Sequence, residues 1–250
     1  MIKDAINIFI DYKDFLISGV INTMILALTG TIIGLLIGLI TGVVRTTPVS
    51  DNPVIAFIQK LINSLIAIYV EIFRGTPMMV QAMVIYWGYA FATGGQTLNL
   101  MFSGIVIVSI NTGAYMAEIV RGGIISIDKG QMEGALSIGM THAQTMIKVI
   151  LPQVIRNILP SVSNEFVINI KDTSVLNVIG VTELYYFSGV IKRTNFQTFQ
   201  TYLVISIIYF ALTFSITRLL RYAEKQLDGA DNYTIFGSQS DPTAEIHVKE

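Results

Sequence analysis

The feature that most constrains the fold of this chain is a stretch of 30 residues, Phe15 to Val44, that contains no charged side chain. About 20 apolar residues are enough for a helix to cross the hydrocarbon core of a bilayer. Backbone N–H and C=O groups find no water there, so a crossing segment must satisfy them internally, most simply as a helix. The stretch therefore predicts a transmembrane helix. Residues 1–14 lack the basic region and cleavage site of a signal peptide, so we expect this helix to be retained.

Composition extends this prediction to the whole chain. Of the 250 residues, 52% are hydrophobic and only 13% are charged, and the mean hydropathy is +0.63. These values are typical of a polytopic membrane protein. A net charge of −1 argues against a nucleic-acid partner, which needs a basic surface. The absence of cysteine excludes thiol chemistry, and two distant histidines, His142 and His247, do not suggest a metal site.

Four glycines recur every four residues within the first apolar stretch: Gly30, Gly34, Gly38 and Gly42. In a helix they form one smooth face. Faces of this kind let two helices approach closely in lipid, where van der Waals packing drives helix association. We therefore expect this face to pack against another helix.

We expect an all-α integral membrane protein with five transmembrane helices. Residues 1–14 are predicted to be an extracytoplasmic amphipathic segment on the membrane surface, residues 15–224 the membrane domain, and residues 225–250 a cytoplasmic polar tail. The predicted spans are residues 15–44, a second crossing completed by residues 78–91, residues 100–120, a fourth span from about residue 157, and residues 202–220. Residues 180–195 are predicted to form an extracytoplasmic loop.

Residues 52–74 are ambiguous, because Lys60 and Glu71 interrupt their apolar pattern and would be costly inside a lipid-surrounded span. We interpret them as an amphipathic helix at the cytoplasmic interface that leads to the crossing at 78–91. A six-span alternative would count residues 54–73 as a full crossing and place the basic loop at 121–156 outside. The positive-inside rule favours five spans, with the N-terminus outside and the C-terminus in the cytoplasm.

The segment from Glu133 to Pro152 is a hydrophilic interruption between apolar segments. One short amphipathic run ends at Gly139, which can adopt the positive φ of a sharp bend, and a second run extends from Thr141 to Leu151. The segment is predicted to contact another protein. The span after it is unusually polar, and such a stripe must face protein or water; its polar residues are Asn157, Ser161, Asn164, Glu165, Asn169 and Asp172.

The run from Ala114 to Leu176 resembles the inner-membrane permease subunit of ATP-binding cassette (ABC) importers, in particular the branch for histidine, glutamine, arginine and cystine. EIFRGTP, Glu71 to Pro77, resembles a signature of the same branch. The family's loop motif reads EAA, three residues, G, nine residues, I, one residue and LP. Gly134 replaces its middle alanine and Val149 its isoleucine. The resemblance implies that the following residues couple the chain to an ATPase: Glu133, Gly134, Ala135, Gly139, Met140, Thr141, Leu151 and Pro152.

The resemblance implies a type I ABC importer permease fold in a bacterial cytoplasmic (inner) membrane. Its implied partners are a cytoplasmic ATP-binding subunit dimer, a second permease subunit in a homo- or heterodimer, an extracytoplasmic solute-binding protein, an amino acid substrate and membrane lipid. The chain contains no GxxxxGK[ST] phosphate-binding loop, so we expect a non-catalytic subunit. ATP and Mg are expected on the partner ATPase, and no cofactor on this chain.

A zwitterionic amino acid needs both a cation and an anion as partners. The candidate substrate-pathway residues are Glu71, Arg74, Glu165, Lys171, Asp172, Thr173 and Ser174. Two other functions stay open from the sequence. An ion-coupled secondary transporter or channel would use the polar stripe as a relay, and a non-transporting scaffold would only recruit an ATPase.

Overall fold

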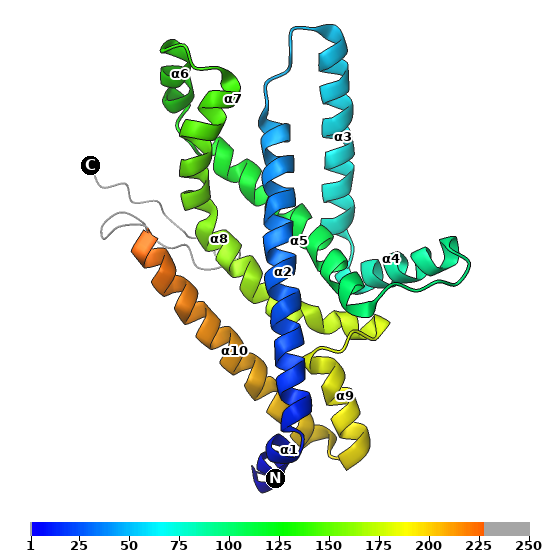
Figure 1. Cartoon of the computed structure of the whole chain (residues 1–250). Coiled ribbons are helices and arrows are strands. Elements are labelled where there is room, and N and C mark those ends of the chain that lie inside the picture. The colour runs from blue at the N-terminus through cyan, green and yellow to red at the C-terminus, as the bar shows by residue number, and fades with distance from the viewer. Residues whose placement is uncertain (1, 228–250) are drawn as a thin grey trace.

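A computed structural model describes residues 2–227, and in this part of the chain the secondary structure is entirely helical. Figure 1 shows long helices crossing one another, with two short helices at one end and the N-terminal helix at the other. The elements are α1 (Ile2–Asp11), α2 (Lys13–Thr46), α3 (Pro53–Gly75), α4 (Met78–Ala92), α5 (Leu100–Ile125), α6 (Lys129–Ser137), α7 (His142–Thr145), a π-helix η1 (Met146–Ile150), α8 (Leu151–Asp172), a 3-10 helix η2 (Thr173–Ile179), α9 (Leu184–Asn195) and α10 (Thr198–Leu227).

The central pair of helices is α2 and α5, which cross along the glycine-lined face of α2 (Figure 1). A Cβ atom on Gly34 would lie 2.8 Å from the Cβ of Thr112, and one on Gly42 would lie 2.6 Å from Cγ1 of Val120. Such separations are too short for carbon atoms, so only glycine permits the observed approach. The sequence predicts that the glycine face packs against another helix, and that helix is α5.

The second crossing differs from the expectation. α3 is one continuous helix of 23 residues, long and apolar enough to cross a membrane, whereas α4 has only 15 residues. At 1.5 Å per residue, α4 extends about 22 Å, which is shorter than the roughly 30 Å hydrocarbon core. The helix expected over residues 52–74 is therefore present, but it is long and apolar enough to span a membrane rather than only to lie at the interface. Its polar face lowers the apolar character without breaking the helix.

Within residues 2–227, the number of candidate spans is four, or five when one bent pair of helices is counted as a single span. The four are α2, α3, α5 and α10, and the bent pair comprises the run His142–Ile179 and α9, which meet at 57°. The predicted loop at residues 180–195 is thus mostly the helix α9. The acidic cap Glu183 begins this helix by accepting hydrogen bonds from the backbone N–H groups of Tyr185 (2.8 Å) and Tyr186 (2.6 Å).

Buried polar side chains join α8 to the α2–α5 pair. The Nδ2 of Asn169 donates to Oγ1 of Thr31 at 2.8 Å, and Oγ1 of Thr112 donates to Oδ1 of Asn169 at 3.1 Å. All three side chains are buried. One amide therefore satisfies groups on two other helices, as a polar residue inside a membrane requires.

The predicted tail at residues 225–250 falls almost wholly outside the described residues, because α10 is described only to Leu227. The predicted segment at residues 1–14 contains α1, which packs against α10.

Candidate functional site

The loop between α5 and α8 is a compact helical unit. Asp128 caps α6, and Gly139 has φ = +86°, so the chain turns sharply between α6 and α7. Thr141 starts α7 with a reciprocal capping box: its Oγ1 accepts from the N–H of Gln144, and its own N–H donates to Oε1 of Gln144 at 2.9 Å. The bend at Gly139 is the one the sequence predicts, and the two caps fix the helix ends on either side of it.

A π-helix, η1, joins α7 to α8 and ends just before Pro152. The N–H of Leu151 donates to the carbonyl of Met146, five residues back. Proline has no N–H and its ring clashes with the carbonyl four residues earlier, here that of Lys148. The π turn, in which the hydrogen bond reaches back five residues instead of four, is wider than an α turn and stands directly before this Leu-Pro pair. The Leu-Pro pair therefore sets the geometry at which the loop enters α8.

The loop has one face packed inward and another exposed. Met146 and Ile150 are buried in a cluster with Val120 of α5 and Val154 of α8. In contrast, Ile138 is 79% exposed. Exposed apolar side chains at a helix–helix turn are typical of a surface that another protein covers; besides Ile138, the exposed ones are Leu136 and Ile147.

Most of the predicted coupling residues lie on the accessible side of this unit. Ala135 is buried, whereas Glu133, Gly134 and Gly139 are exposed. A Cβ added to Gly134 would meet no atom within 4 Å. The remaining predicted residues are exposed or half-buried: Met140, Thr141, Leu151 and Pro152.

A three-residue ion network ties α2 to α5 near their loop-side ends. Arg45 of α2 pairs with Glu118 of α5, and Arg121, one turn further along α5, pairs with the second oxygen of the same carboxylate at 2.8 Å. This network depends on how α2 and α5 cross, which the sequence does not indicate.

Two of the predicted substrate-pathway residues lie close enough to interact. The Arg74 guanidinium at the end of α3 stands over the ring of Tyr115 of α5, 5.6 Å from its centroid. Glu165 of α8 is only 6% exposed, and its carboxylate interacts electrostatically with both Arg74 and Asp172. Because α3 and α8 both pack against α5, this helix brings the cation and the carboxylate to one region (Figure 1). Tyr115 was not among the predicted residues.

The other candidates fall into two environments. Glu71, Lys171 and Asp172 are exposed on the surfaces of α3 and α8. Thr173 is buried, and its Oγ1 donates to the carbonyl of Ile170 at 3.1 Å, while Ser174 is half-buried. Thr173 therefore has a structural partner in this structure.

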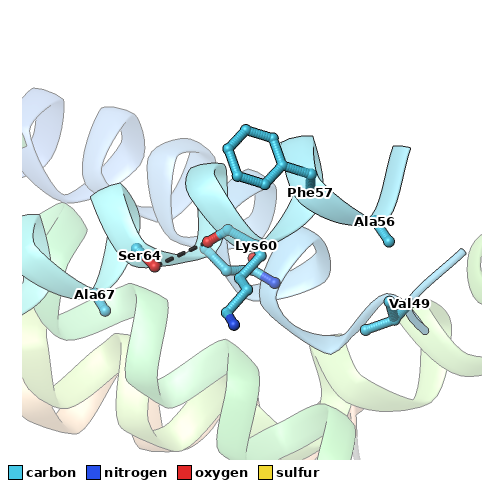
Figure 2. Close-up of a pocket in the computed structure, with 7 residues that line it drawn as sticks. Val49, Ala56, Phe57, Lys60, Ser64 and Ala67 are labelled. Atoms are coloured by element: carbon cyan, nitrogen blue, oxygen red, sulfur yellow. Dashed lines mark hydrogen bonds between the residues drawn. The ribbon is translucent and has the colours of Figure 1, made fainter. Parts of the chain in front are cut away.

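A groove of about 600 Å³ lies along α3 near its loop-side end, lined by the polar Lys60, Asn63 and Ser64 and by the apolar Val49, Ala56, Phe57 and Ala67 (Figure 2). The Ser64 hydroxyl donates to the Lys60 carbonyl at 2.9 Å, as Figure 2 shows. The buried Oδ1 of Asn63 has no hydrogen-bond partner among the described residues. The sequence does not indicate that these residues line a groove.

The break between α3 and α4 is held by a buried amide. Nε2 of Gln81 donates to the carbonyls of Phe73 (2.9 Å) and Thr76 (2.8 Å), and its Oε1 accepts from Asn111 of α5 at 2.8 Å. The network fixes the end of α3, and with it Arg74, relative to α5.

These features define a class: a multi-pass helical membrane protein whose spans are joined by a compact loop with an exposed apolar surface. The chain belongs to the family of inner membrane components of binding-protein-dependent transport systems, which it matches over residues 53–229. It is a multi-pass permease subunit of an ABC importer in the inner membrane, and such systems also contain an ATPase and a binding protein.

The relatives in sequence include several amino acid permeases. The chain is 36% identical over 165 residues to the glutamine transport system permease protein GlnP of Escherichia coli K12, covering 66% of this chain and 75% of GlnP. It is 39% identical over 163 residues to the L-cystine transport system permease protein TcyB of Bacillus subtilis, covering 65% of this chain and 69% of TcyB.

The fold also matches solved structures. A crystal structure of an amino acid ABC transporter with histidines matches with a TM-score of 0.74 at 35% identity, over 87% of this chain and 96% of that one. An inward-facing structure of the methionine ABC transporter MetNI matches with a TM-score of 0.64, over 85% of this chain and 97% of that one. At 18% identity, the second match establishes the fold alone.

Proposed function

We propose that this permease moves a polar amino acid into the cell by alternating access, coupled to a separate ATPase through the loop at residues 133–152. The observation that carries the proposal is the exposed apolar surface of the loop at Leu136, Ile138 and Ile147. This loop bends at Gly139 and is packed against α5 and α8 through its buried side. Relatives named as glutamine and cystine permeases support the cargo class, and they favour an importer over an ion-coupled transporter or channel.

The mechanical step in this proposal is rigid-body movement. The loop shares a buried cluster with α5 and α8, so a push on α6 and α7 tilts those helices rather than bending a flexible linker. Asn169 and the glycine face of α2 carry the same motion to α2. Helices joined in this way open one side of the membrane as they close the other.

The proposed cargo site uses Arg74 and Glu165 as the cation and carboxylate for a zwitterion. The carboxylate of the amino acid would bind the Arg74 guanidinium and its ammonium would bind Glu165, with Tyr115 holding the arginine in place. The groove at Lys60 and Asn63 would continue this path toward the loop-side end of α3. Glu71, Lys171, Asp172, Thr173 and Ser174 stay candidates for the rest of the pathway.

The proposed assembly contains two permease subunits, as a homodimer or heterodimer, with two ATP-binding subunits on the loop side. A solute-binding protein delivers the amino acid on the opposite side. In this arrangement α2, α3, α5, the bent α8–α9 pair and α10 are the five spans. The N-terminus is extracytoplasmic, the C-terminus is cytoplasmic, and ATP and Mg act on the ATPase subunits.

The proposal is tested by Gly139→Asp in the assembled transporter. Aspartate at φ = +86° is strained, and the distorted turn misdirects the loop surface. We expect membrane insertion to persist and ATP-driven amino acid uptake into proteoliposomes to be lost. The matched control is Gly134→Ala, which adds a Cβ in open space and should transport normally. Normal uptake by Gly139→Asp would refute coupling through this turn.

A further inference from the structure

The first helix, α1, has three chemically different sides. On the first side, Ile8 is 3% exposed and packs in a cluster that includes Ile191 of α9 and Val204 and Ile205 of α10. Ala5, one turn earlier, is packed against the same cluster. This side packs α1 against the rest of the protein, so α1 is an integral part of the fold.

The second side of α1 is apolar and uncovered within the described residues. Ile6 is 54% exposed, Phe9 54% and Ile10 58%. Their spacing of three and four residues places them together on one stripe of the helix. The third side is polar, with Lys3, Asn7 and Asp11 all exposed; Asn7 and Asp11 repeat the four-residue step from Lys3.

The position of α1 identifies what the apolar stripe meets. α1 lies at the start of α2, at the end of the molecule opposite the loop of α6 and α7 (Figure 1). α1 packs on α10, which is a candidate membrane span. Phe199 near the start of α10 and Phe15 near the start of α2, a second candidate span, are both exposed. The stripe therefore lies at the same end of the molecule as the exposed apolar side chains that begin the two spans on which α1 rests.

The charges on α1 indicate the form of contact. Lys3 is offset by Asp4 and Asp11, so α1 carries no basic excess with which to hold anionic headgroups. An interfacial helix of this composition binds through its buried apolar area, and the binding depends little on salt or lipid charge. A membrane of zwitterionic phospholipid is therefore sufficient.

We propose that α1 is an in-plane membrane anchor whose stripe of Ile6, Phe9 and Ile10 inserts at the headgroup–acyl boundary of the leaflet opposite the loop. By packing on α10 and on the start of α2 at the same time, α1 fixes the depth at which the outer ends of these helices lie. This inference is independent of the cargo and of the ATPase, because it depends only on the chain spanning a bilayer.

The test uses the single tryptophan of the chain. In a Trp87→Phe background, Phe9→Trp places a fluorophore on the apolar stripe, and Asn7→Trp places one on the polar side. Each variant is reconstituted in phosphatidylcholine vesicles with and without bromines on the upper acyl chain. We expect Phe9→Trp to emit at shorter wavelength and to lose most of its emission in brominated vesicles, while Asn7→Trp keeps its emission. Added salt should change neither result.

The alternatives give different results. If α1 docks a soluble protein, Phe9→Trp escapes the bromines and shifts its emission only when the binding protein is added, which overturns the proposal. If a second copy covers the stripe, Phe9→Trp also escapes the bromines, and its emission changes when the protein is diluted in the membrane. Ile10→Trp repeats the measurement at a second position, so that misfolding of one variant leaves the proposal testable.

Discussion

Glu165 is the acidic side chain on which the proposed cargo site depends most. It is buried on α8, and its electrostatic partners are on a different helix, Arg74, and on its own helix, Asp172. Replacing it by the isosteric glutamine removes the charge and keeps the shape. A single charge-assisted hydrogen bond contributes about 1.5–3 kcal/mol, so its loss in the transport step corresponds to roughly a 10- to 100-fold slower rate.

We therefore expect Glu165→Gln to reduce ATP-driven uptake about 10-fold or more at saturating liganded binding protein, while basal ATPase activity persists. The measurement is radiolabelled amino acid uptake into proteoliposomes. Asn164→Gln, at the exposed neighbouring position, is the control and should transport like the wild type. Equal uptake by Glu165→Gln and the control would remove Glu165 from the pathway.

Some single residues could be predicted from the sequence and others could not. Gly139 was predicted to bend the loop because positive φ is costly for other residues, and the structure has φ = +86° there. The pairing of Arg74 with Tyr115 could not be predicted, because it requires knowing how α3 crosses α5. Long-range partners of this kind depend on packing geometry that one sequence does not encode locally.

Among the helices, too, some features could be predicted from the sequence and others could not. The four-residue glycine repeat predicted a close helix contact, and its partner is α5. The bounds of α3 and α4 agree with the predicted segments, but the sequence interpretation assigned the crossing to residues 78–91 because of the charges at Lys60 and Glu71, whereas α3 is the helix long enough to span a membrane. The two charges lie on one polar face, and such a face is tolerated wherever it turns toward protein or a water-filled path. Hydropathy alone cannot distinguish that situation from an interfacial helix.

The α2–α5 contact gives a stability prediction. A Cβ on Gly34 would lie 2.8 Å from Thr112 Cβ and 3.1 Å from the backbone N of Gly113. Gly34→Ala should therefore destabilise the helix pair by about 1–3 kcal/mol through overpacking. The matched control is Gly122→Ala, whose Cβ meets nothing within 4 Å. The same substitution there should be neutral or stabilising by up to about 1 kcal/mol, because alanine favours helix.

The measurement is the midpoint of thermal unfolding of both variants in one detergent, followed by size-exclusion chromatography. A lower midpoint for Gly34→Ala than for Gly122→Ala is the expected result. Equal midpoints would mean that α2 and α5 can separate without cost, and the rigid-body mechanism proposed for them would then fail.

The π-helix before α8 gives a second prediction for an element. Pro152 both removes an N–H and crowds the Lys148 carbonyl, which is the physical reason for the wider turn. Pro152→Ala allows an ordinary α-helix, and closing the π turn rotates α6 and α7 relative to α8 by about one residue, roughly 100°. The loop surface then no longer faces its partner in the same orientation.

We expect Pro152→Ala to insert and fold normally but to hydrolyse more ATP per amino acid transported. ATPase and uptake rates measured in the same proteoliposomes give this ratio. The control is Pro160→Ala, which removes the proline inside α8, away from the loop. An unchanged ratio in Pro152→Ala alone would show that the π turn has no part in coupling.

The molecule as a whole has two ends with different expected partners. The loop of α6 and α7 lies at one end, and α1 lies at the other (Figure 1). In the proposed orientation the first end faces the cytoplasmic ATPase and the second faces the solute-binding protein. The absence of native cysteine allows each end to be tested with one introduced thiol and no background labelling.

We predict that Asn7→Cys and Gln96→Cys, at exposed positions before α2 and between α4 and α5, react with a membrane-impermeant maleimide in intact spheroplasts. Ser137→Cys in the loop and Asp51→Cys between α2 and α3 should react only after the membrane is permeabilised. This pattern requires the segment formed by α3 and α4 to cross the bilayer once, because Asp51 and Gln96 flank both helices. If Asp51→Cys and Gln96→Cys label on the same side, this segment does not cross once, and the assignment of five spans is wrong. If all four positions show the reverse pattern, the loop faces outward and cannot meet a cytoplasmic ATPase.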